Sequence, residues 1–248
     1  MRKFALMFLV LIGLTSCAYT EEIVFNNDGS GKYNVKMDGS SFMAMAGDQA
    51  LASGLGENQL KDIDTTLVFK QLLKEHQDSI SKLSAEKQKE WQKLENLVIQ
   101  MKLKTAQKQF LVSLDNNFKN ITDLQDVTKM LHSLQNLEGK EGQQAQEFTK
   151  MIENNAEVSY NYSPKKFTRT TKVLAKDKKE DESDSPDMTK MLFQSSSYVM
   201  RYSFPKKIKK VSNAEALFSE DKKTVTLKYP FTDYMENPKK LDLVVEFE

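Results

Sequence analysis

The stretch TEEIVFNNDGSGKYNVKMD, residues 20–38, decides the fold of this chain. Its first six residues end in an apolar, β-branched run, and residues 27–31 are all turn formers. Tyr33, Val35 and Met37 then alternate with polar residues, which is the period of a half-buried strand. We therefore predict a β-hairpin over residues 20–38.

The same alternation of apolar and polar residues recurs along the rest of the chain. It predicts strands at 62–68, 97–104, 109–114, 158–162, 167–174, 198–204, 208–212, 225–229 and 241–247. Apolar residues at one-face helical spacing predict helices at 69–83, 85–94 (with Ser84 as N-cap) and 121–137, and 39–58 is read as a short helix or a loop. Because strands and helices come in blocks, we expect an α+β fold: a mainly antiparallel, curved β-sheet with several amphipathic helices packed on one face.

The first seventeen residues have the organisation of an export signal. Arg2 and Lys3 precede an apolar run at 4–14, which is too short to span a bilayer but has the length of a signal-peptide core. The run ends in Leu14-Thr15-Ser16-Cys17, and here the chain resembles bacterial lipoproteins, whose lipobox reads Leu, two small residues and Cys. The resemblance implies cleavage between Ser16 and Cys17, and palmitate-type acyl chains on Cys17.

This signal divides the chain into a signal peptide, 1–16, and one membrane-anchored domain, 17–248, with a flexible charged loop at 176–190. Cys17 is the one cysteine, so disulfides are excluded. Fewer than five residues separate Cys17 from the hairpin, which places the body within about 15 Å of the membrane. If the cell is Gram-negative, Ala18 lacks the Asp that retains lipoproteins in the inner membrane, which favours the outer membrane.

Two further stretches, 27–33 and 198–226, resemble uncharacterised Bacteroidetes-type lipoproteins and LppM-like lipoproteins. This resemblance implies an α+β membrane-anchored domain in which lipid or partner binding takes precedence over catalysis. It supplies no catalytic residue.

The charge composition excludes nucleic acid as a partner. Without residues 1–16 the formal net charge falls from +1 to about −1, and Arg169 and Arg201 are the remaining arginines. Nucleic-acid sites depend on the planar, bidentate arginine side chain. We expect instead the membrane as partner through Cys17, together with an envelope protein or a lipid.

Candidate catalytic residues are few. His76 and His132 lie far apart in the sequence, and each is expected on the face of a helix without a chemical role. Asp62 with Asp64, or Asp233 with Glu236, supply carboxylates for a hydrolase, which is the alternative interpretation. We expect no enzyme activity, no metal site and no cofactor.

A lysine-rich run is the candidate contact for anionic headgroups: Lys206, Lys207, Lys209 and Lys210. The other interpretation is a strand edge that lysines protect against unwanted pairing. The sequence thus predicts a lipid-anchored envelope lipoprotein that acts as a structural, partner-binding or lipid-binding module.

Overall fold

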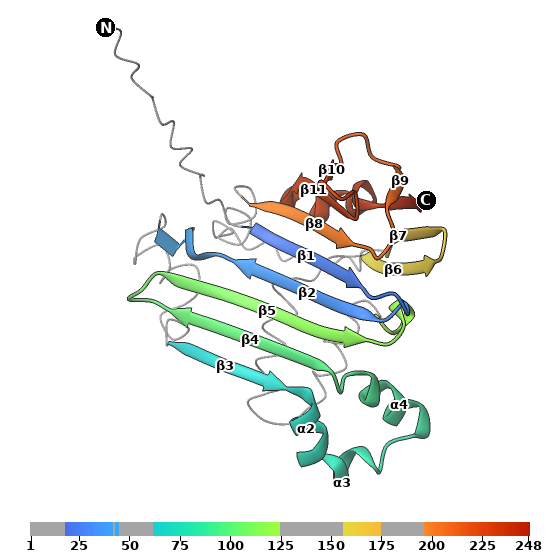
Figure 1. The fold of residues 1–248 in the computed structure, drawn as a ribbon. Helices are drawn as coiled ribbons and strands as arrows, with labels where there is room; N and C mark the ends of the chain where they lie inside the picture. The colour runs from blue at the N-terminus through green and yellow to red at the C-terminus, as the bar shows by residue number, and fades with distance from the viewer. Residues whose placement is uncertain (1–17, 42, 45–61, 125–155, 175–195) are drawn as a thin grey trace, which may run out of the picture.

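The computed structural model describes residues 18–41, 43–44, 62–124, 156–174 and 196–248 (Figure 1). They form two sheets and several short helices. An eight-stranded sheet has the order β10-β11-β8-β1-β2-β5-β4-β3, and a four-stranded sheet has the order β6-β7-β12-β9. The α+β class and the mainly antiparallel pairing are confirmed, and the division of the strands between two sheets is an addition to the prediction.

The eight-stranded sheet is built around the predicted hairpin. Its strands are β1 (Ala18–Phe25), β2 (Gly31–Asp38), β3 (Ile63–Val68), β4 (Leu97–Lys104), β5 (Gln109–Phe118), β8 (Ser197–Ser203), β10 (Leu217–Phe218) and β11 (Thr224–Pro230). β1 pairs with β2 antiparallel and with β8 parallel, while the other pairs in this sheet are antiparallel. β1 therefore lies in the middle of the sheet, with hydrogen-bonded neighbours on both sides.

The four-stranded sheet contains β6 (Ala156–Ser163), β7 (Lys166–Val173), β9 (Ile208–Val211) and β12 (Leu243–Phe247). It packs against the inward face of β1 and β8. The ring of Phe167, fully buried in β7, lies 5.6 Å from Phe25 and 5.3 Å from Tyr202 between ring centroids. A shared aromatic core thus joins the two sheets.

The described helices are short and lie mainly at the ends of strands. They are α2 (Phe69–Glu75), α3 (Gln77–Ile80), α4 (Ala85–Lys93), α8 (Phe231–Glu236) and the 3₁₀ helices η2 (Ile121–Asp123) and η3 (Pro238–Leu241). Figure 1 shows α2, α3 and α4 beyond the ends of β3 and β4. Over β1 and β8, the layer that covers the large sheet is the four-stranded sheet.

The predicted helix at 69–83 is divided at His76, whose ψ of 15° ends α2 and precedes α3. The hydroxyl of Ser81 then donates to the carbonyl of Asp78, a local bond that competes with helix continuation. Ser84 caps α4 as predicted, since its side chain accepts from the backbone N–H of Lys87. Several predictions lie outside the described residues: the signal peptide with Ser16 and Cys17, most of 39–58, the helix after 124 with His132, and the loop at 176–190.

Gly31, at the start of β2, leaves no room for a side chain. A Cβ built there lies 2.3 Å from the carbonyl oxygen of Val24 and 2.5 Å from the ring of Phe118. Replacing Gly31 with alanine is expected to lower the free energy of unfolding by about 1–3 kcal/mol, because backbone and core ring must both move. Urea denaturation would measure the change. Lys36→Ala, at an exposed position of β2, is the control and should differ little from the wild type.

Candidate functional site

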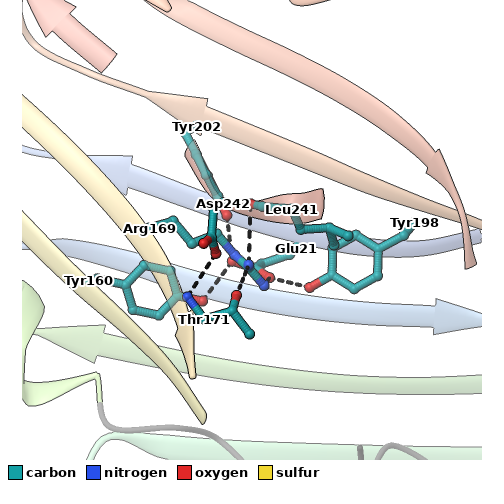
Figure 2. Close-up of polar contacts among 8 residues, drawn as sticks. All are labelled: Glu21, Tyr160, Arg169, Thr171, Tyr198, Tyr202, Leu241 and Asp242. Atoms are coloured by element: carbon teal, nitrogen blue, oxygen red, sulfur yellow. Dashed lines mark hydrogen bonds and ion pairs between the residues drawn. The ribbon is translucent and has the colours of Figure 1, made fainter. Parts of the chain in front are cut away.

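A buried carboxylate lies at the centre of the inward face of β1. Glu21, 2% exposed, is in register with Met200 of the parallel strand β8. Because side chains of a strand alternate, Tyr198 and Tyr202 lie on the same face on either side of Met200. Both hydroxyls donate to Glu21, that of Tyr202 at 2.6 Å to Oε1 and that of Tyr198 to Oε2 (Figure 2).

The four-stranded sheet completes this cluster from the opposite side. Tyr160 and Arg169 are cross-strand partners in β6 and β7, so they point to the same face. The Tyr160 hydroxyl donates to Glu21 Oε1 at 2.7 Å, and Arg169 Nη2 lies 3.5 Å from Glu21 Oε2. The carboxylate therefore receives three hydroxyl bonds and one ion pair, and it links both sheets.

Arg169 is itself held by polar groups of its own sheet. Its Nη1 donates to Thr171 Oγ1 at 3.2 Å and to the Leu241 carbonyl at 3.3 Å, while its Nε has no hydrogen-bond partner in the described part of the chain. Asp242 accepts from the backbone N–H of Thr171 at 2.7 Å. Figure 2 shows these groups gathered around the guanidinium.

The electrostatics of the cluster fix the protonation state of each member. Burial raises the pKa of Glu21, but the charge of Arg169 and the three hydroxyl bonds outweigh it and hold that pKa below its ordinary 4.5. Burial, reinforced by the Glu21 charge, raises the pKa of Tyr160, Tyr198 and Tyr202 well above 10.0. Near neutral pH the carboxylate is charged and every hydroxyl keeps its proton.

This arrangement has the properties of a structural link. Glu21 and Arg169 are each 2% exposed, so no solute reaches them, and every hydroxyl proton of the three tyrosines is directed at the carboxylate. A group that exchanges protons with a substrate needs access and a pKa near the working pH. The cluster has neither, and it joins the two sheets through buried polar contacts. We name these residues, Glu21, Tyr160, Arg169, Tyr198 and Tyr202, the Glu21 cluster.

The sequence-based reasoning does not find the Glu21 cluster, although a signal for it is present. Glu21 stands in phase with Tyr19, Ile23 and Phe25, all of them on the buried face of β1. Arg169 stands in phase with Phe167 of β7. A charged residue in phase with core residues on one strand, matched by the opposite charge on another strand, predicts a buried ion pair.

A second candidate lies where four loops meet. Residues 27–29, 119–121, 162–164 and 205–206 surround a hollow of about 480 Å³, which we call the loop-end groove. The first of these loops follows the last residue of β1. Since strand residues advance about 3.3 Å each, the groove lies roughly 23 Å along β1 from Ala18. It is open to solvent and combines polar and apolar surface.

The four lysines of the lysine-rich run lie in two different parts of the structure. Lys206 lines the loop-end groove and donates from Nζ to the Pro164 carbonyl at 2.9 Å. Lys209 and Lys210 lie in β9, an edge strand of the four-stranded sheet, and Lys207 directly precedes it. All four are exposed, and this position fits the edge-protection interpretation. Their contact with headgroups stays a prediction.

The candidate carboxylate pairs do not face each other across a cleft. Asp62 and Asp64 are both exposed and both lie near Lys104 Nζ, at 3.8 and 3.6 Å. Asp233 pairs with Lys240 at 2.7 Å, and Glu236 is exposed on the same short helix. His76 is half-buried at the junction of α2 and α3.

A metal-binding cluster and a membrane-crossing helix are both absent from the part of the chain that the structure describes. Among them, no three side chains of His, Cys, Asp or Glu gather in a way that would hold a metal ion. None of the helices formed by these residues is both long enough and apolar enough to cross a bilayer.

Comparison with known proteins adds one likeness. The sequence matches no protein-family model and no curated protein. Among solved structures, the chain is similar to the folded domain of LppM from Mycobacterium tuberculosis, solved by NMR, with a TM-score of 0.36 and 6% identity over 94% of this chain and 89% of that one. A likeness this low carries no argument about function.

Proposed function

We propose that this protein is a lipid-anchored lipoprotein of the bacterial cell envelope and that it serves as a structural or binding module without catalysis. The membrane is its first partner, through acyl chains on Cys17. The sequence Leu14-Thr15-Ser16-Cys17 supports the anchor, and Ala18 in the next position supports the outer membrane in a Gram-negative cell. A lipid or an envelope protein would be the further partner.

One observation carries the proposal. β1 begins at Ala18, the residue that directly follows Cys17, and Ala18 is already paired with Asp38 of β2 and Ser197 of β8. A lipid on Cys17 would thus be joined to the central strand of the sheet with no intervening linker. The body would lie directly on the leaflet, closer than the sequence alone predicts.

The start of β1 is also firmly packed. Tyr19 lies 4.7 Å from Tyr198, 5.6 Å from Phe231 and 5.8 Å from Tyr234, measured between ring centroids. These rings come from β8 and α8, so two elements hold the start of β1 by ring packing. A body fixed in this way would present the loop-end groove away from the membrane.

The absence of catalysis is supported by where the carboxylates lie. The buried one, Glu21, is enclosed by its partners, and the candidate pairs on the surface are solvated and have lysine neighbours. A hydrolase of the carboxylate type needs two such groups facing a substrate cleft, one of them in a desolvated environment.

Labelling with radioactive palmitate tests the anchor. Cells that express the protein should incorporate label into it and retain it in the membrane fraction, whereas Cys17→Ser should carry no label and appear in the soluble fraction. The reason is that every acyl chain in this proposal is attached to Cys17, and the attachment requires its sulfur atom. Separation of inner from outer membranes would then test the position that Ala18 favours.

Lys36→Ser is the matched control, since Lys36 is exposed on β2 and lies away from the lipobox. It should be labelled like the wild type. Equal labelling of the wild type and Cys17→Ser, or release of the wild type into the soluble fraction, contradicts the proposal.

A further inference from the structure

The loop-end groove is built from ordered turns of both sheets. In the turn between β1 and β2, the backbone N–H of Ser30 donates to Asp28 at 3.0 Å. On the opposite side, Lys206 bridges two loops through its bond to the Pro164 carbonyl. The N-cap Asn120 is fixed by reciprocal bonds with η2. A ligand would therefore meet a preformed surface, which lowers the entropy lost on binding.

The lining of the groove contains two cationic side chains and one carboxylate. Lys119 and Lys206 are both exposed, and neither forms an ion pair within the described part of the chain. Asp28 is the one acidic residue of the lining, and its carboxylate accepts two bonds from Ser30, at 3.0 Å from the backbone and 2.6 Å from the hydroxyl. The uncommitted charge of the groove is therefore positive, and it suits a ligand that carries acidic groups.

The groove also has a volume and an apolar surface beyond what a simple anion needs. About 480 Å³ lies within the range of sites for small organic ligands. Tyr162 contributes a half-buried ring that stacks on Phe25 at 4.3 Å, and Pro164 and Pro205 add apolar surface beside it. Aromatic and proline rings next to amide and ammonium groups suit a hydroxylated ring whose C–H groups pack on them.

We infer that the loop-end groove binds an acidic saccharide, with Lys119 and Lys206 contacting its carboxylate or phosphate groups and Tyr162 packing against a sugar ring. This site goes beyond the proposed function, and its ligand chemistry does not depend on the anchor. The anchor decides only that the groove would face away from the membrane.

Isothermal titration of the full-length protein in detergent tests the inference with three probes: trigalacturonate, the neutral maltotriose and inorganic phosphate. Trigalacturonate should bind saturably, at least roughly tenfold more tightly than either of the others. Lys119→Gln and Lys206→Gln should each weaken it roughly tenfold, the effect of one lost hydrogen bond to a charged group.

The control is the double variant Lys209→Gln, Lys210→Gln, which removes two exposed charges outside the groove. It should leave trigalacturonate affinity within about twofold. Three results would overturn the inference: no saturable binding of trigalacturonate, phosphate binding as tight as trigalacturonate, or an equal loss in the control variant. Failure of palmitate labelling would affect none of them, so the two proposals fail separately.

Discussion

Arg169→Met is expected to lower the free energy of unfolding by roughly 3–5 kcal/mol, the cost of leaving one member of a buried ion pair without the other. Methionine nearly preserves the volume of the arginine stem but removes the charge that faces Glu21 at 3.5 Å. The carboxylate would keep three hydroxyl donors and lose its countercharge while it stays buried. Urea denaturation followed by tryptophan fluorescence would measure the loss, since Trp91 is buried.

The neighbouring pair of Glu22 and Arg201 is a matched control. It has the same chemistry one position along β1, but points outward, with its charged atoms 3.8 Å apart and its side chains 35% and 49% exposed. Arg201→Met should cost less than about 1 kcal/mol, as exposed ion pairs do. Similar losses in Arg169→Met and Arg201→Met would show that the Glu21 cluster is not the link between the sheets.

The pH dependence of the free energy of unfolding provides a second test of the Glu21 cluster. Because the folded state holds the pKa of Glu21 below its ordinary 4.5, ionised Glu21 stabilises the fold above that pH. This contribution is lost as the pH falls from 4.5 through the lowered pKa of the folded state. The stability difference between wild type and Glu21→Gln, measured by urea denaturation, should therefore shrink from pH 6 towards pH 3.

Phe167→Ala is expected to cost roughly 3–5 kcal/mol, the range for removing a large buried side chain from a core. Phe167 is fully buried, and its ring contacts Tyr160 of its own sheet and Phe25, Tyr202 and Phe204 from the other side. The substitution empties the space between the sheets. Thermal and urea unfolding would both report the change.

Phe218→Ala is the control for this substitution. Phe218 lies in β10 at the edge of the large sheet and is 50% exposed, so its loss should change stability by no more than about 0.5 kcal/mol. A loss for Phe167→Ala as small as that for Phe218→Ala would mean that the sheets are held together elsewhere.

The strands could be predicted from the sequence because most bury only one face. Tyr33, Val35 and Met37 alternate with polar residues, and the structure places them as the sequence predicts, as it does for the hairpin of β4 and β5. The division into two sheets could not be predicted. It depends on β1 pairing with β8, which brings Tyr198 to Glu21 across 177 residues, and local periodicity contains no information about such a partner.

For the candidate sites, too, the sequence predicts the local features but not the contacts between distant segments. Asp62 and Asp64 share a face as their spacing predicts, but whether that face is a cleft depends on the neighbouring strands. The loop-end groove combines residues from four separate loops, each of which reads in the sequence as an ordinary turn. Glu21 and Arg169 each stand in phase with the buried residues of their own strand, which is a local signal. Only the packing of the two sheets shows that the two charges meet.

The direct step from Cys17 to β1 has a mechanical consequence for an anchored protein. A force that pulls on the acyl chains parallel to β1 would load the hydrogen bonds from β1 to β2 and β8 in shear. Many of these bonds would have to break at the same time. Peeling from an edge would instead break them one after another. Under such a force the acyl chains would be extracted from the bilayer before β1 separated from the sheet. The detached protein would therefore remain folded.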